Sequence, residues 1–376
     1  MIDPFYVMEV QRRAFELEAM GRRIIHMEIG QPDFGAPPCV RDAVSEAMAT
    51  HSLGYTDALG MRVLREGIAR FYAERFGVDV SPGRIIITAG ASGAFLLLCG
   101  TMFGPGDEVL LPAPGYPCNR HFVAMFDATP TDLLVEPEES FQPTVEAIEA
   151  AWGPATRGIV IATPSNPTGT SMPFEHLAAA ARIVRERRGA LIVDEIYQSL
   201  SYGPRERTVL ELGDDCYVVN SFSKYFNLTG WRIGWLVAPD AVVPDLERLA
   251  QNAFICPSAP AQYAALAALT PQAISIYEDR RAEFKKRRDF MVPALQAIGF
   301  KVPAMPDGAF YIYADCSAFC DDSFSFAFEL LERAGVAITP GRDFRGSRPG
   351  GFVRFAYTQS LESLATGIDR IAKALK

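Results

Sequence analysis

The sequence lacks the long apolar segments and the leader pattern that direct a chain into or across a membrane. No uncharged apolar run in the 376 residues reaches the roughly 18 residues of a membrane-spanning helix. The first residues, Met-Ile-Asp-Pro-Phe-Tyr, do not combine a basic region with an apolar core, so no signal peptide is indicated. We therefore expect no membrane partner and a cytoplasmic location.

Cysteine is sparse and has no framework spacing. The seven cysteines are dispersed and odd in number, which fits a reducing compartment better than a disulfide scaffold. Cys316 and Cys320 have no pair of histidines nearby, so zinc binding is not indicated and we expect no metal site. Internal repeats and low-complexity segments are also missing.

The sequence also has no excess of basic residues over acidic ones. The formal net charge of −9 disfavours general binding to nucleic acid or to anionic membranes, although a local basic site can still hold a small anion. The basic run at residues 285–288 lies in a helical pattern rich in Glu and Arg, so a solvated helix face explains it better than a nucleic-acid patch. We expect no nucleic-acid partner.

Through the middle of the chain, short apolar runs alternate with helical patterns. Strands are expected at residues 84–88, 108–111, 158–162, 190–193, 216–220 and 234–237. Helices are expected at residues 6–22, 38–50, 61–76, 90–98 and 174–187. Strands that alternate with helices predict an α/β fold with a mostly parallel sheet covered on both faces.

After Pro271 the pattern changes. A long charged helix is expected from about residue 274 to 295, kinked or broken at Pro293, followed by strands at 309–314 and 351–356 around a helix near 324–334. This predicts a smaller α+β domain, which the N-terminal segment joins because the central block separates the two ends. The expected division is 1–45 for the N-terminal segment, 46–275 for the large domain and 276–376 for the small domain.

Lys224 lies between two apolar runs and has aromatic and small hydroxyl residues around it. A desolvated lysine loses proton affinity and can attack a carbonyl to form a Schiff base. Ser221 and Arg232 can hold a phosphate, and so can residues 90–92, a strand-to-helix turn whose amides favour an anion. For Arg232 alone, a structural ion pair is the alternative. Together these residues indicate a covalently held, phosphorylated aldehyde cofactor.

Asp194 follows the buried-strand run at residues 191–193, so it lies at the strand end where ligands of open α/β sheets bind. A carboxylate there can pair with a protonated ring nitrogen and keep the ring an electron sink. The alternative is an aspartate that caps the next turn. Tyr197 and Asn166 can donate to a ring oxygen, and Tyr116 is either a stacking aromatic or a turn residue.

Arg354 is a single arginine in an apolar strand, Val-Arg-Phe-Ala. An isolated buried guanidinium is costly unless it is paired, so it needs an anion. A substrate carboxylate held by a two-pronged contact is one candidate. An internal Asp or Glu is the other, and the two remain equally open on these residues.

In order and in kind, these residues resemble the fold-type I pyridoxal-phosphate enzymes, specifically the aspartate aminotransferase-like class I/II aminotransferases. The resemblance covers nearly the whole chain. The matching segments are residues 30–34, Tyr55 with residues 60–65, residues 165–169, 194–197, 221–224, 230–234 and 307–311, and Arg354. The resemblance implies a large domain with a seven-stranded, mostly parallel sheet.

The resemblance also implies roles for the matching residues. Lys224 would carry pyridoxal 5′-phosphate and shuttle the proton, with Asp194 at the pyridine nitrogen and Tyr197 at the ring hydroxyl. The further cofactor contacts would come from Asn166, Tyr116, Ala91, Ser92, Ser221 and Arg232. The substrate carboxylate would be held by Arg354, Gly30 and Asn166. Tyr55 would reach the phosphate of the other subunit, which implies a homodimer with shared sites.

The implied activity is ping-pong transamination between an L-amino acid and a 2-oxo acid. A carbon–sulfur β-lyase or a cyclopropane-forming synthase of the same fold is the first alternative. A ligand-sensing module of a transcription regulator is the second, and we do not expect it because the first motif begins at residue 30 and leaves no room for a winged helix. No second cation for a substrate side chain is evident, since Arg12, Arg13, Arg22 and Arg23 are expected on solvated helix positions. A neutral or aromatic amino acid is therefore expected as donor.

Overall fold

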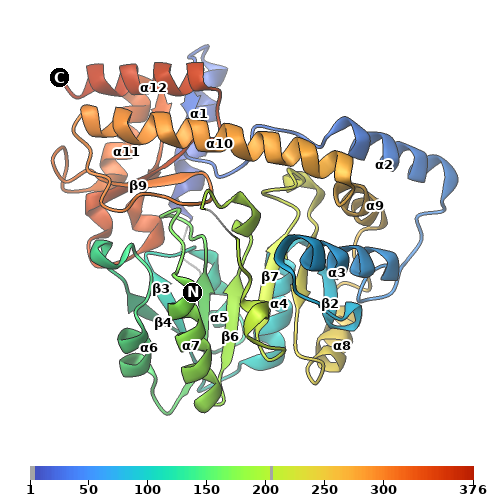
Figure 1. Ribbon diagram of the computed structural model, residues 1–376. Coiled ribbons are helices and arrows are strands. Elements are labelled where there is room, and N and C mark those ends of the chain that lie inside the picture. The colour runs from blue at the N-terminus through green and yellow to red at the C-terminus, as the bar shows by residue number, and fades with distance from the viewer. Residues whose placement is uncertain (1–4, 204–205) are drawn as a thin grey trace.

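The computed structural model describes residues 5–203 and 206–376. Its largest sheet is a β-sheet with helices packed on it (Figure 1). Within the described residues this sheet has seven strands in the order β2-β8-β7-β6-β5-β3-β4. They are β2 (Ile85–Thr88), β3 (Glu108–Ala113), β4 (Thr129–Leu134), β5 (Thr156–Ala162), β6 (Ala190–Asp194), β7 (Tyr217–Ser221) and β8 (Gly234–Val237). β8 runs antiparallel to both neighbours, whereas the other pairs are parallel. The predicted mostly parallel sheet is confirmed.

The edge strand β4 was not predicted from the sequence. Its residues include Pro130 and Asp132, and Leu133 alone among them is buried. An edge strand pairs on one side only and tolerates proline, so its composition is close to that of a loop. The six strands that were predicted are the more deeply buried ones.

Alternate residues of the central strands face opposite sides of the sheet and pack into separate cores. In β6, Leu191 and Val193 belong to one apolar cluster, whereas Ile192 belongs to the other. The first cluster is completed by α3 (Arg62–Phe76), α6 (Val145–Ala151), α7 (Phe174–Glu186) and α9 (Ala259–Ala268). The second is completed by α4 (Gly90–Met102), α5 (Cys118–Ala124) and α8 (Val243–Ala253). Helices therefore cover both faces, as the alternating pattern predicted.

Elements from the two ends of the chain pack together beside this sheet (Figure 1). A small antiparallel sheet has the order β11-β12-β9, formed by β11 (Thr339–Pro340), β12 (Phe352–Ala356) and β9 (Tyr311–Asp315). β1 (Ile25–His26) pairs in parallel with β10 (Val336–Ala337), and α1 (Tyr6–Ala19) contacts α11 (Ser323–Ala334). The last helix, α12 (Leu361–Ala374), contacts both β1 and α11. α1 and β1 thus pack against elements from the C-terminal end of the chain.

The helix α10 (Pro271–Ala297) runs along the top of the molecule in Figure 1, from α12 at one end to α2 (Pro38–Thr50) and α9 at the other. It does not break at Pro293, contrary to one of the two expectations at that residue. A proline removes one backbone hydrogen bond, and the buried side chains Met291, Val292 and Leu295 hold this end of the helix in place. None of the described helices combines the length and apolarity that crossing a membrane requires.

Candidate active site

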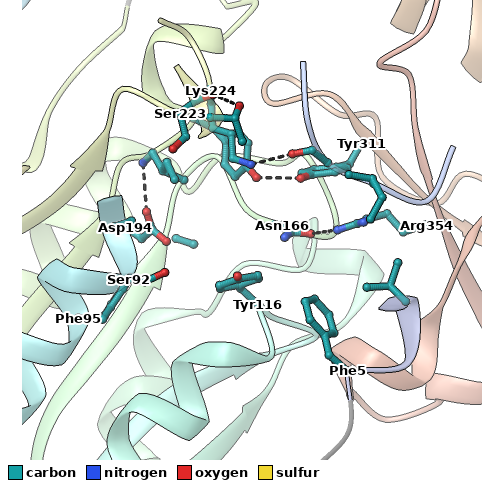
Figure 2. Close-up of a pocket in the computed structure, with 18 of the residues that line it drawn as sticks. Phe5, Ser92, Phe95, Tyr116, Asn166, Asp194, Ser223, Lys224, Tyr311 and Arg354 are labelled. Atoms are coloured by element: carbon teal, nitrogen blue, oxygen red, sulfur yellow. Dashed lines mark hydrogen bonds between the residues drawn. The ribbon is translucent and has the colours of Figure 1, made fainter. Parts of the chain in front are cut away.

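The strands of the large sheet bring the predicted residues to one edge. Asp194 is the last residue of β6, and Asn166 follows the end of its parallel neighbour β5. Lys224 follows β7, which also runs parallel to β6. Because the carboxyl ends of parallel strands meet at the same edge, these three side chains line one cavity of about 230 Å³ (Figure 2).

The cavity brings together most of the predicted site residues and leaves two outside its lining. The predicted residues that line it are Gly30, Ala91, Ser92, Tyr116, Asn166, Asp194, Tyr197, Lys224, Arg232 and Arg354. Ser221 is buried behind the lining and donates from its hydroxyl to Oγ of Ser223 across 2.9 Å, while Ser223 itself faces the cavity. Tyr55 is 85% exposed and does not line the cavity of its own chain.

No carboxylate among the described residues forms an ion pair with the Lys224 amine. Its Nζ donates to the backbone oxygen of Gly30 across 2.7 Å and lies 5.8 Å from the ring centre of Tyr197. The pKa of the amine is lowered to about 8, first by burial and then by the charges of Arg354 and Arg232, against the opposing effect of Asp194. A lysine in this state is a nucleophile close to neutral pH, as the sequence predicted for a desolvated lysine.

Asp194 has one of the two roles that the sequence left open, because its side chain caps the next turn. One carboxylate oxygen accepts from the backbone amide of Ile196 across 3.1 Å, so the residue does cap the next turn. Burial nevertheless raises the pKa of the carboxyl to about 7, because this amide and the charge of Lys224 offset only part of the desolvation. A buried carboxylate with so little compensation is stabilised by a cationic group placed beside it.

Arg354 lies on β12, on the side of the cavity opposite Asp194, as Figure 2 shows. Its Nη1 donates to Oδ1 of Asn166 across 2.7 Å, and its Nη2 donates to the backbone oxygen of Glu28 and to Oγ1 of Thr339. Nε is buried without a hydrogen-bond partner, and no carboxylate among the described residues forms an ion pair with this guanidinium. The internal Asp or Glu that the sequence allowed is therefore not found in the described chain.

Two tyrosines complete the inner wall. The hydroxyls of Tyr197 and Tyr311 lie 2.8 Å apart, and both residues are buried. Gly30 makes this packing possible, since a Cβ on Gly30 would lie 1.7 Å from the Tyr311 hydroxyl. Tyr311 belongs to a motif that the sequence singled out, but no role was deduced for it. Its contact with Tyr197 joins β9 to the end of β6.

Several hydrogen-bond donors lie together at the start of α4. Gly90 has a φ of +70°, and a Cβ there would lie 2.6 Å from Nη2 of Arg232, so only glycine lets the guanidinium approach the helix N-terminus this closely. Ala89, the residue that precedes the helix, offers no side-chain cap to its free amides. Free amides, a nearby guanidinium and the Ser92 hydroxyl together match the donors that a phosphate requires.

An apolar wall closes the side of the cavity near Arg354, and sequence reasoning missed it. We use this term for Phe5, Val7 and Met8 at the start of α1, which line the cavity. The Phe5 ring meets the Tyr116 ring edge-on, with centroids 6.4 Å apart (Figure 2). Apolar residues at a helix start have the same sequence pattern whether they face a core or a ligand, so no signal marked them.

Known proteins match this chain along its length. The family model for aminotransferase class I and II matches residues 22–371. A valine–pyruvate aminotransferase of Mycobacterium tuberculosis is 39% identical over 376 residues, which cover 100% of this chain and 97% of the relative. An aspartate/prephenate aminotransferase of Thermus thermophilus is 34% identical over 375 residues, which cover 99% of this chain and 96% of the relative.

The structure agrees with the sequence matches. The crystal structure of an aminotransferase from Mycobacterium tuberculosis has a TM-score of 0.96 and 39% sequence identity, and the match covers 100% of this chain and 97% of that one. The sequence match and the structural match both extend over nearly the whole chain. The chain therefore belongs to the class I and II aminotransferases, and it is a transaminase that depends on pyridoxal phosphate.

Proposed function

We propose that the cavity holds pyridoxal phosphate with the phosphate at the start of α4 and the ring nitrogen at Asp194. The donor set supports this placement, because Arg232 and the free amides of α4 suit a phosphate dianion. A protonated ring nitrogen supplies the cation that the buried Asp194 carboxylate lacks. Lys224 is the one lysine among the lining residues and would carry the aldehyde carbon. In this placement Tyr197 and Asn166 contact the ring oxygen, Tyr116 stacks on the ring, and Ala91, Ser92 and Ser221 belong to the phosphate corner.

We further propose how the chain's own groups divide the reaction. When bound, pyridoxal phosphate supplies an electron sink for the charge that develops at the α-carbon of the amino acid. The Lys224 amine takes up the α-proton and returns it, because a pKa of about 8 lets it act in both directions near neutral pH. Arg354, which lines the cavity, binds the α-carboxylate beside the amide of Asn166 and the backbone of Gly30.

The substrate class follows from the apolar wall, which is the observation that carries this part of the proposal. Phe5, Val7 and Met8 face the cavity beside Arg354, and Arg232 is already used at the phosphate corner. The arginines near the N-terminus do not line the cavity; Arg12 pairs with Glu16, and Arg13 pairs with Glu16 and Glu332. We therefore infer that the donor is an amino acid with an apolar side chain.

The names of the relatives include both an apolar and an acidic donor. The valine–pyruvate aminotransferase is named for a branched apolar donor, whereas the aspartate/prephenate aminotransferase is named for an acidic one. A panel of valine, leucine, phenylalanine, aspartate and glutamate, tested against pyruvate and 2-oxoglutarate, decides between them. We expect kcat/KM to be at least about tenfold higher for the apolar donors. Reaction with aspartate and glutamate alone would contradict the proposal, and steady ammonia release without an acceptor would indicate a lyase.

We also propose a homodimer in the reducing environment of the cytoplasm. Tyr55 is a large exposed aromatic residue that does not line the cavity of its own chain. Its exposure supports a role in the cavity of a second copy. All seven cysteines are free thiols in the structure, which supports the reducing compartment. The division into residues 1–45, 46–275 and 276–376 remains part of this proposal.

A further inference from the structure

The first turn of α1 is capped from a distant part of the chain. Phe5, the residue at the N-cap position, has no side chain that can accept a hydrogen bond. The free amides of Tyr6 and Val7 instead donate to Oδ1 and Oδ2 of Asp343, each across 2.8 Å. One carboxylate thus satisfies two amides at the positive end of a helix dipole, which is a stabilising arrangement for both partners.

Asp343 is itself fixed to the strand that carries Arg354. It is buried, with 6% of its surface exposed, and it lies in the short helix η6 (Gly341–Phe344) directly after β11. A Cβ on Gly341 would lie 2.4 Å from the backbone oxygen of Phe352, so this helix is pressed against the start of β12. The ring of Phe344 lies 5.0 Å from Cζ of Arg354. The carboxylate therefore has a set position relative to Arg354.

The two amides that Asp343 holds belong to the turn that forms the apolar wall. Phe5, Val7 and Met8 line the cavity, whereas Tyr6 faces the other way and packs edge-on against Phe324 with ring centres 5.4 Å apart. Further along α1, Arg13 pairs with Glu332 of α11. These contacts anchor the rest of α1. Loss of the Asp343 carboxylate should therefore loosen the first turn of α1 without unfolding the protein.

We propose that Asp343 is a positioning residue that sets the selectivity for the donor side chain by fixing the apolar wall at a defined distance from Arg354. Its carboxylate touches neither the amino acid nor the cofactor in this proposal. It acts through the backbone amides of Tyr6 and Val7. The selectivity part rests on the proposed apolar donor, whereas the wall-fixing part does not.

The first test measures amide hydrogen exchange on the protein stripped of cofactor. In Asp343→Ala we expect the amides of Tyr6 and Val7 to exchange about tenfold faster, because two charge-assisted hydrogen bonds are lost. Asp343→Asn keeps one acceptor oxygen, so it provides a milder variant if the alanine variant folds poorly. Ser360→Ala is the matched control, since Ser360 caps α12 through the amide of Ser363 and does not line the cavity. Unchanged exchange at Tyr6 and Val7 in both Asp343 variants would overturn the proposal.

The second test separates KM from kcat. In Asp343→Asn we expect KM for valine to rise about tenfold while kcat changes less than about twofold, because the wall contributes to binding and not to proton transfer. KM for alanine should change less than about twofold, because a single methyl group buries little apolar surface. Equal losses for both donors, or a loss in kcat alone, would overturn the proposal. If the wild-type enzyme shows no preference for apolar donors, the substrate proposal fails, and the exchange experiment still decides the role of Asp343.

Discussion

The guanidinium of Arg354 donates to the side-chain oxygen of Asn166 across 2.7 Å inside the cavity. This bond ties a residue of the small antiparallel sheet to the loop that follows β5 of the large sheet. It also fixes the orientation of the Asn166 amide, since an oxygen that accepts from Arg354 leaves the amide nitrogen free to donate on its other side. The proposed carboxylate site and the proposed ring site are therefore joined by a direct contact.

Arg354→Lys should weaken binding of the amino acid. A lysine has one ammonium group, which cannot replace the planar contacts to Asn166, Glu28 and Thr339 while also binding a carboxylate. We expect kcat/KM to fall about 10- to 100-fold, mainly through KM, in steady-state assays with the preferred donor. Arg185→Lys, at an exposed ion pair with Asp215, is the matched control and should keep wild-type kinetics. An unchanged KM in Arg354→Lys would exclude the proposed carboxylate contact.

Lys224→Ala should abolish both turnover and covalent attachment of the cofactor. The variant loses the amine that is proposed to bind the aldehyde and to move the α-proton, so we expect activity to fall by more than about 10³-fold. Mass spectrometry after borohydride reduction checks the attachment, which should appear at residue 224 in the wild type and disappear in the variant. Lys285→Ala removes an exposed lysine that pairs with Asp289 and serves as the control. Normal turnover in Lys224→Ala would refute the assignment.

Mixing two inactive variants should restore activity if the sites are shared between subunits. Tyr55→Ala removes the group that each chain is proposed to lend to its partner, and Lys224→Ala removes a group from the chain's own cavity. In a mixed dimer, the cavity of the Tyr55→Ala chain keeps Lys224 and receives Tyr55 from the other chain. An equal mixture, reassembled at random, should recover about a quarter of wild-type activity. Activity no greater than the average of the two separate variants would argue against shared sites.

His26 should stabilise the fold at low pH and lose that effect as the pH rises. It lies 2.7 Å from the buried Glu28 and 3.1 Å from Glu18, and the hydrogen bond to Glu28 raises its pKa to about 9 against the opposing effect of burial. The folded state holds the proton more tightly than the unfolded state. The contribution is therefore complete below the ordinary pKa of 6.5 and disappears as the pH rises from there through about 9.

His26→Gln tests this contribution. We expect the variant to lose on the order of 2 kcal/mol of unfolding free energy at pH 6 and almost nothing at pH 10. Urea unfolding at a series of pH values measures the difference. His176→Gln, which removes an exposed histidine of α7, is the matched control. A loss that is equal at both pH values would assign His26 a packing role instead.

The predictable part of the site consists of residues whose chemistry conflicts with their surroundings. A lysine between apolar runs, an aspartate at the end of a buried strand and an arginine inside an apolar strand each need a partner. Lys224, Asp194 and Arg354 could therefore be found from local sequence, and the structure places all three in one cavity. The large sheet was predictable for a related reason, because buried parallel strands form distinct apolar runs.

The residues that escaped prediction depend on contacts far apart in the sequence. Val7 has the pattern of an ordinary core residue, and Asp343 follows Gly-Arg in a segment typical of a loop. Their connection spans 336 residues, and nothing local indicates it. β4 escaped because this edge strand is mostly exposed or half-buried and contains a proline and an aspartate. The proposed division at residues 45 and 275 cuts α2 and α10, since a continuous helix gives no break in the pattern.

Gly30 has a consequence for redesign of this enzyme. Its missing side chain leaves room for the Tyr311 hydroxyl, and its backbone oxygen receives the Lys224 amine. Any larger residue would push on Tyr311 and, through the same backbone, shift the resting place of the reactive amine. Variant libraries that seek a new amino donor can therefore vary Phe5 or Met8. Position 30 must stay glycine, although glycine has no side chain.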